Sequence, residues 1–188
     1  KLTAENVRLK VLEDENKALR EQINFYSRHQ YQKMVANIIS RKGTGKSSQI
    51  IIIDKGESDG VKAGQAIIAG SGIIAGKIFS VDREMSHGYL LTDERCQVAA
   101  SLVGEDKVSG IARGELGLTV KMDFIPQKKA IQSGNIIITS GLEPAIPKGL
   151  IIGDVQSVEK ENNNLFQSAV INPSANLSTL SIVSIIVN

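Results

Sequence analysis

The chain has 188 residues, of which 41% are hydrophobic, and a formal net charge of +2 at pH 7. This hydrophobic share suffices for a folded core and excludes a globally disordered chain. The net charge is small and Lys and Arg are scattered along the sequence, which excludes a groove that binds nucleic acid. The single cysteine, Cys96, excludes an intramolecular disulfide, and the presence of only two histidines, His29 and His87, argues against a structural zinc site.

The first 33 residues contain neither Gly nor Pro, whereas the rest of the chain holds all 17 Gly and all 4 Pro. Leu, Glu, Lys, Asn and Arg are frequent in this first segment, which is the composition of an exposed helix. The sequence therefore predicts a helix over residues 1–33, with a boundary near Gln32–Val35.

This helix carries the heptad pattern of a parallel two-stranded coiled coil. Asn16 falls on the seam, where a paired Asn fixes register and strand number at some cost in stability. Position d includes one charged residue, Glu5. The predicted dimerisation residues on the seam are Leu2, Leu9, Asn16 and Ile23 at position a, and Leu12, Leu19 and Tyr26 at position d.

Flanking charges favour the same orientation, because Arg8 with Glu13 and Glu15 with Arg20 form attractive pairs between positions g and e′ of a parallel homodimer. The alternative is a solvated amphipathic helix that packs on the chain's own β region. Four heptads form a short seam, so a stable dimer would rely on a membrane anchor or on the β region as well.

From Val35 onward the apolar pattern becomes that of strands, and runs such as Ile50–Ile53 are β-branched and bounded by turn residues. No later stretch keeps a helical period, so helices there should be minor. The predicted strands are 35–40, 49–54, 65–69, 73–81, 88–92 and 97–102, then 108–114, 118–124, 135–139, 150–158, 166–171 and 180–187.

The two strand sets resemble each other. One shared pattern is a turn that ends in Gly and is followed by a polar residue and a strand, and it occurs in Asp59–Ile68 and in Lys129–Ile138. A second match is that of Gly76–Val81 with Gly153–Val158. The distance along the chain between these two matching segments is seven residues longer in the second set, and the segment Gly141–Pro147 would accommodate the difference. We therefore expect a mainly β fold, in which an N-terminal coiled-coil α-helix (1–33) precedes two small six-stranded β-barrel-like domains (34–103 and 104–188). Exchange of strands between these domains stays open.

Short Gly-punctuated segments, each weak alone, occur in an order and spacing that resemble the extracytoplasmic region of the MreC family of rod shape-determining proteins. The likeness covers nearly the whole chain. The family has Gly-Asp where this chain has Gly134-Asn135, which is a conservative departure. The segments are Leu9–Leu19, Asp54–Gly56, Gly60–Gly64, Gly70–Ile78, Leu90–Asp93, Gly110–Gly114, Ser133–Leu142, Pro147–Val155 and Asn172-Pro173.

The resemblance implies a structural scaffold of the bacterial cell-shape (elongation) machinery, without a cofactor, that dimerises and can form filaments. It implies a single-pass protein of the cytoplasmic membrane, with a transmembrane helix before Lys1 and the β domains on the extracytoplasmic side. No apolar run in this sequence approaches the roughly 18–20 residues of a membrane span. The implied partners are a class B penicillin-binding protein, a SEDS-type glycosyltransferase, MreD and, indirectly, the actin-like MreB.

Two alternatives remain at this point. Paired six-stranded barrels are also the architecture of trypsin-like serine hydrolases, and His87, Asp93 and Ser140 are the residues from which a triad could be drawn. Ser140, however, lacks the Gly-Asp-Ser-Gly context of those enzymes, so the sequence favours a protein that is not an enzyme. The second alternative, a periplasmic adaptor of an export system, normally has a long helical hairpin that this chain lacks.

Other motifs indicate no site. Gly43–Ser47 is similar to a phosphate-binding loop, but Ser40 stands where the first Gly is required and a strand follows in place of a helix. Two acidic turns lack the spacing of a calcium loop. We also expect Cys96 to be a small core residue, and the exposed strand edges of the β domains to suit partner binding by strand addition. The acidic residues of the two turns are Asp54, Glu57, Asp59, Asp82 and Glu84.

Overall fold

The structure, a computed structural model, describes residues 31–43, 49–160 and 165–187. The predicted coiled-coil helix lies outside the described residues except at its last three positions, where the first strand already begins at Gln32. Within the described residues, no helix combines the length and the apolar character needed to cross a bilayer.

The described residues form twelve strands and one 3₁₀ turn, η1 (Glu57–Asp59), which confirms the mainly β prediction. Each predicted strand coincides with one observed strand, because Ile and Val runs bounded by Gly or polar turns persist along the chain. The strands are β1 (Gln32–Lys42), β2 (Ile50–Ile53), β3 (Ala66–Ala69), β4 (Ile73–Val81), β5 (Ser86–Leu90), β6 (Gln97–Leu102), β7 (Glu105–Glu115), β8 (Thr119–Pro126), β9 (Ile136–Thr139), β10 (Ile151–Lys160), β11 (Phe166–Pro173) and β12 (Ile182–Val187).

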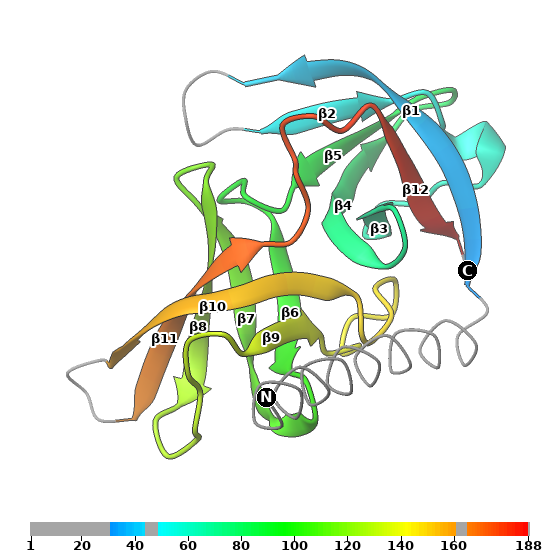
Figure 1. Ribbon diagram of the computed structural model, residues 1–188. Coiled ribbons are helices and arrows are strands. Elements are labelled where there is room, and N and C mark those ends of the chain that lie inside the picture. Colours follow the sequence, from blue (N-terminus) through cyan, green and yellow to red (C-terminus); the bar gives the residue numbers. More distant parts are fainter. Residues whose placement is uncertain (1–30, 44–48, 161–164, 188) are drawn as a thin grey trace, which may run out of the picture. The chain divides into compact units, whose positions relative to one another are not determined.

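The strands close into two six-stranded rings within one compact unit, residues 32–188 (Figure 1). Ring one has the order β4-β3-β12-β1-β2-β5 and closes through the pairing of β4 with β5. Ring two has the order β11-β8-β7-β6-β9-β10 and closes through β10 and β11. One parallel pair, Ile73 with Ile151, connects the two rings.

The last strand of the chain belongs to the first ring. Figure 1 shows β12, in dark red, returning to lie beside β1, in blue, and β12 pairs with β1 and β3. Strand β6 instead pairs with β7 and β9. Ring two therefore starts at Gln97, before the expected boundary between residues 103 and 104. The reason is that a ring closes only when each edge strand has a partner. In ring one, β12 is the strand that pairs with both β1 and β3.

The rings repeat the same ladder irregularities at equivalent residues, in agreement with the internal repeat. Between β3 and β4 the register shifts at the step from Ile74 to Gly76, and between β9 and β10 at the step from Ile151 to Gly153. A second bulge adds Phe79 to β4 and Gln156 to β10. Bulges of this kind bend and twist a strand, so they curve both sheets at matching positions.

The core of each ring is aliphatic, as the low aromatic content requires. The alternation along each strand turns one set of side chains inward, and β-branched residues fill that interior. The largest fully buried side chains are Ile51, Ile53, Ile67, Ile68, Ile74 and Ile78 in ring one, with Met122, Ile125, Ile137, Ile146 and Leu150 in ring two, and Leu91 between β5 and β6.

Ring closure corrects the expectation of open strand edges. Each strand has a neighbour on both sides over part of its length, so little backbone is left for strand addition. Past Val155, β10 pairs with β11 alone, but the bulge at Gln156 and the exposed charges of Glu159 and Lys160 protect that stretch. Partner binding is therefore to be sought on side-chain surfaces.

Candidate functional site

The predicted dimerisation seam lies outside the described residues, so it stays a prediction. The same holds for the charge pairs beside it. The residues concerned are Leu2, Leu9, Leu12, Asn16, Leu19, Ile23 and Tyr26 on the seam, and Arg8, Glu13, Glu15 and Arg20 at its flanks.

The three residues considered for a hydrolase triad have separate partners. His87, in β5, contacts Asp82 through Nε2 at 3.0 Å. Asp93 is bound by Arg95 and by the backbone N–H of Gln49. Ser140 Oγ accepts the backbone N–H of Leu142. Within the described part of the chain no hydrogen bond joins any two of the three, so this structure holds no nucleophile and base pair there.

Asp54 and Asp59, two acidic residues of the first acidic turn, are bound by protein groups. Asp54 accepts two hydrogen bonds from Asn37, and Asp59 accepts from Lys55 and from the backbone of Gly56. Outside the gaps at 1–30, 44–48 and 161–164, and apart from the side chains of 105–107, no cluster of three or more His, Cys, Asp or Glu side chains suited to a metal ion is found. Cys96 is fully buried, as expected, and burial raises the pKa of its thiol to about 12, so the thiol stays protonated.

The four aromatic side chains of the two rings all lie at the surface or half-buried, and the buried hydrophobic core contains none. They form two pairs, Phe79 with Tyr89 on ring one and Phe124 with Phe166 on ring two. Exposed aromatic side chains are enriched at protein interfaces and at their energetic hot spots. Because the aromatic side chains of the two rings lie outside the core, these surfaces are suited to binding other proteins.

The ring two pair is exposed by a bulge. Val120 and Met122 point inward, so strict alternation would also turn Phe124 inward. Instead Asp123 and Phe124 together face Ser168 of β11, Ile125 takes the inner position and Phe124 is 57% exposed.

The backbone of Phe124 has φ of 63°, in the left-handed region that costs a non-glycine residue about 1–2 kcal/mol. The ring of Phe166 packs edge-on against the ring of Phe124, with 6.1 Å between the two ring centroids. Leu165 is 67% exposed beside Phe166, and Ile111 is 40% exposed opposite Asp123. We call these four side chains the ring two aromatic surface: Ile111, Phe124, Leu165 and Phe166.

The ring one pair is stacked. Phe79, on the bulge of β4, lies 3.9 Å from Tyr89 with the ring planes 13° apart, and Arg95 lies over Tyr89 at 4.4 Å. Arg95 is itself held by two hydrogen bonds to Asp93. The equivalent bulge residue in ring two is Gln156, so the bulge does not require an aromatic side chain.

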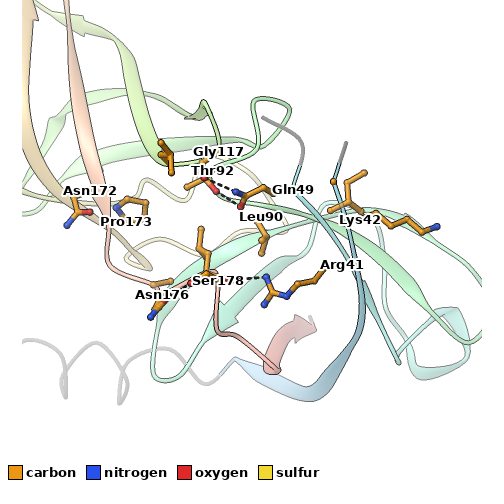
Figure 2. A pocket seen from close by; sticks show the side chains of 15 residues that line it. Arg41, Lys42, Gln49, Leu90, Thr92, Gly117, Asn172, Pro173, Asn176 and Ser178 are labelled. Carbon is orange, nitrogen blue, oxygen red and sulfur yellow. Dashed lines mark hydrogen bonds between the residues drawn. The ribbon is translucent and has the colours of Figure 1, made fainter. Parts of the chain in front are cut away.

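A polar network joins the two rings beside a cleft of about 500 Å³ (Figure 2). Gln49 donates from Nε2 to the carbonyl of Gly117 in ring two, at 2.7 Å, and accepts from Thr92 Oγ1. Its backbone N–H binds Asp93, whose side chain is 1% exposed. This network fixes the connection between β5 and β6 against both rings.

Asp93 should make stability depend on pH in the acid range. Burial raises the pKa of its carboxyl, but the hydrogen bonds from Arg95 and Gln49 outweigh burial and hold it below the ordinary value of 3.8. Because the folded-state pKa is lowered, the stabilisation is complete above the unfolded value and is lost as pH falls through the folded value.

We therefore expect the free energy of unfolding to fall with pH below about 4. The Asp93→Asn variant should be less stable at neutral pH and should show a shallower fall. Urea denaturation followed by circular dichroism between pH 2.5 and 7 measures both, and an equal slope in the two proteins would contradict this role of Asp93.

Sequence patterns missed these surfaces for identifiable reasons. Period-two alternation places Phe124 in the core, and only the bulge reverses it. The Gln49 network forms between residues far apart in the chain, and no local motif marks it. One signal was available: a chain with 4% aromatics and abundant Ile can fill its core without them, which leaves Phe and Tyr for the surface.

Comparison with known proteins gives consistent matches. The family profile described as rod shape-determining protein MreC, barrel core, matches residues 38–187. The cell shape-determining protein MreC of Listeria monocytogenes is 33% identical over 93% of this chain and 60% of its own length. That of Escherichia coli is 30% identical over 88% of this chain and 45% of its own length. The chain thus spans about half the length of these curated relatives.

Solved structures agree. MreC of Listeria monocytogenes superimposes with a TM-score of 0.75 at 30% identity, over 98% of this chain and 89% of the other. A structure described as a complex between the penicillin-binding protein PBP2 and MreC from Helicobacter pylori gives a TM-score of 0.69 at 16% identity, over 85% and 99%. Both relatives above are named for cell shape and the family is a structural one, which confirms the interpretation that the chain is not an enzyme.

Proposed function

The chain belongs to the MreC family of rod shape-determining proteins, and on that basis we propose that it is a scaffold of the bacterial elongation machinery. The scaffold acts at the outer face of the cytoplasmic membrane and holds peptidoglycan-synthesis enzymes. Exposed aromatic surfaces on two closed rings, without a catalytic constellation in the described residues, are consistent with a role in binding.

Self-association is the first part of the proposal. The helix over residues 1–33 forms a parallel two-stranded coiled coil through its Leu seam, with Asn16 setting the register. A membrane helix upstream anchors the dimer, and filaments can build on it. The coiled coil brings two sets of rings together, so a partner with two binding sites is held with raised effective concentration.

Binding of a class B penicillin-binding protein is the second part, and the ring two aromatic surface is the face we assign to it. The observation that carries this assignment is Phe124, a large exposed side chain held on strained backbone. Backbone strain that holds a large apolar side chain outside the core points to a binding role, because strained residues cluster at functional sites. The Helicobacter pylori complex supports a partner of this class. A SEDS-type glycosyltransferase, MreD and, indirectly, MreB are further proposed partners.

The Phe124→Asn variant tests this face. Asn tolerates the left-handed region, so the variant should fold with an unchanged or higher midpoint of thermal unfolding. Loss of a hot-spot aromatic costs about 2 kcal/mol or more, so we expect affinity for the extracytoplasmic region of the class B penicillin-binding protein to fall about 30-fold. Titration calorimetry measures the affinity.

The matched control is Phe79→Gln, which removes an exposed aromatic from ring one and installs the residue that ring two has at the equivalent bulge. This variant should bind the penicillin-binding protein like the parent chain. Equal binding by Phe124→Asn and the parent would refute the assignment of the face. Equal weakening by both variants would show that the loss is not specific to ring two.

A further inference from the structure

The cleft between the rings is lined by both of them and by the segment that returns from β11 to β12 (Figure 2). Among the described residues that line it, two are cations and none is an acid. The lining residues that bear on ligand binding are Arg41, Lys42, Ile50, Leu118, Asn172 and Asn176.

Arg41 carries a positive charge into this cleft without a carboxylate to balance it. Its guanidinium donates to the carbonyl of Leu177 at 2.8 Å and to that of Leu180, and Figure 2 shows it directed toward the segment of Asn176. Within the described residues, neither Arg41 nor Lys42 forms an ion pair. A guanidinium has five N–H donors, so two carbonyls do not exhaust it.

Neither of two acids near the cleft pairs with Arg41 or Lys42. Asp93, beneath Gln49, is buried and bound by Arg95. Asp154 accepts a long hydrogen bond, 3.5 Å, from the side chain of Asn172 at the cleft margin. The cleft therefore presents a net positive charge, with Lys42 adding to it from the rim, where its side chain points outward in Figure 2.

The rest of the lining suits a peptide. Leu118 is 73% exposed at the rim and Ile50 is half-buried, which gives an apolar contact beside the charge. The side chains of Asn172 and Asn176 are exposed and can bind a backbone. A phosphate polymer would need several cations in a row, and the described lining has two, Arg41 and Lys42.

We propose that the cleft is a docking site for an acidic, extended segment of a partner protein. A carboxylate of that segment binds at Arg41, and an apolar side chain packs on Leu118 and Ile50. The site is separate from the ring two aromatic surface, because the eight residues of β11 from Phe166 to Pro173 put the two surfaces roughly 20 Å apart. It does not depend on the proposed binding of a penicillin-binding protein.

The test uses the ¹⁵N-labelled chain and two hexapeptides, acetyl-Leu-Glu-Leu-Asp-Leu-Glu-amide and its uncharged analogue acetyl-Leu-Gln-Leu-Asn-Leu-Gln-amide. The acidic peptide should shift the amide resonances of Gln49, Gly117 and Asn176 at submillimolar concentration, and the analogue should bind at least tenfold more weakly. The Leu118→Ser variant should weaken acidic-peptide binding about tenfold, since it removes an apolar contact worth about 1.5 kcal/mol.

Two matched variants complete the test. Leu142→Ser removes a side chain that is 77% exposed away from the cleft and should leave binding unchanged. Lys42→Gln should weaken binding about threefold, as expected for a charge at the rim. Equal binding of the two peptides, shifts outside the cleft, or no effect of Leu118→Ser would each refute the proposal. Inorganic phosphate that produces the same shifts at equal concentration would refute it too, because the site would then bind small anions.

Discussion

Gly76→Ala and Gly153→Ala are each expected to unfold the protein or to lower its free energy of unfolding by about 3 kcal/mol or more. These glycines occupy equivalent positions in the two rings, Gly76 where β4 meets β5 and Gly153 where β10 meets β11. Both pairings close their ring, so a local clash there acts on the whole barrel.

The physical reason is the approach of the neighbouring backbone. A Cβ on Gly153 would lie 1.9 Å from the carbonyl oxygen of Asn172, and one on Gly76 would lie 2.1 Å from that of Tyr89. A flexible side chain could rotate away from such a contact, but a carbonyl in a β-ladder moves only with its strand. Separating the strands breaks ladder hydrogen bonds in the interior, where water does not replace them.

Urea denaturation followed by circular dichroism measures the loss, with Ser71→Ala as the control. Ser71 is exposed in the turn between β3 and β4, so this variant should match the parent chain within about 0.5 kcal/mol. If either glycine variant kept the parent stability, the tight closure of that ring would be refuted.

The double variant Leu12→Asp, Leu19→Asp is expected to convert the chain from dimer to monomer. Both residues occupy position d of the predicted seam, and a coiled coil of four heptads has few other apolar contacts to compensate. Four buried carboxylates per dimer would repel one another and lose their water. The rings should remain folded, because the buried hydrophobic side chains of the described residues all come from Ala36 to Ile186.

The matched control is Val11→Asp, Ala18→Asp, which introduces the same charges one residue earlier, at position c of the heptad. Sedimentation equilibrium should give a dimer for this control and a monomer for the seam variant. A dimer in both proteins would refute the seam, and a monomer in both would indicate that charge alone dissociates the helix.

Sequence patterns predict the strands of this fold well and its connections poorly. Runs such as Ile50–Ile53 have the composition and length of strands, and the neighbouring Gly and polar residues mark their ends. The sequence similarity between Gly76–Val81 and Gly153–Val158 corresponds to bulges at equivalent positions in the two rings. Family membership also follows from short segments in a fixed order, and the match over residues 38–187 confirms it.

Ring membership and the candidate surfaces could not be predicted in the same way. The exchange of β12 into ring one depends on which edge strand lacks a partner, and strand composition does not encode that. Exposure of Phe124 depends on a single inserted residue in β8. The positive charge of the cleft depends on Arg41 meeting the carbonyls of Leu177 and Leu180 from the far end of the chain.

Light scattering measures self-association and partner binding together, in a mixture of the chain with the extracytoplasmic region of the class B penicillin-binding protein that we propose as its partner. A scaffold that dimerises through its helix and binds one enzyme on each ring two aromatic surface predicts a complex of two chains with two enzymes. The Phe124→Asn variant should give only the dimer and the free enzyme. A complex of one chain with one enzyme, or no complex for the parent chain, would contradict the proposed scaffold.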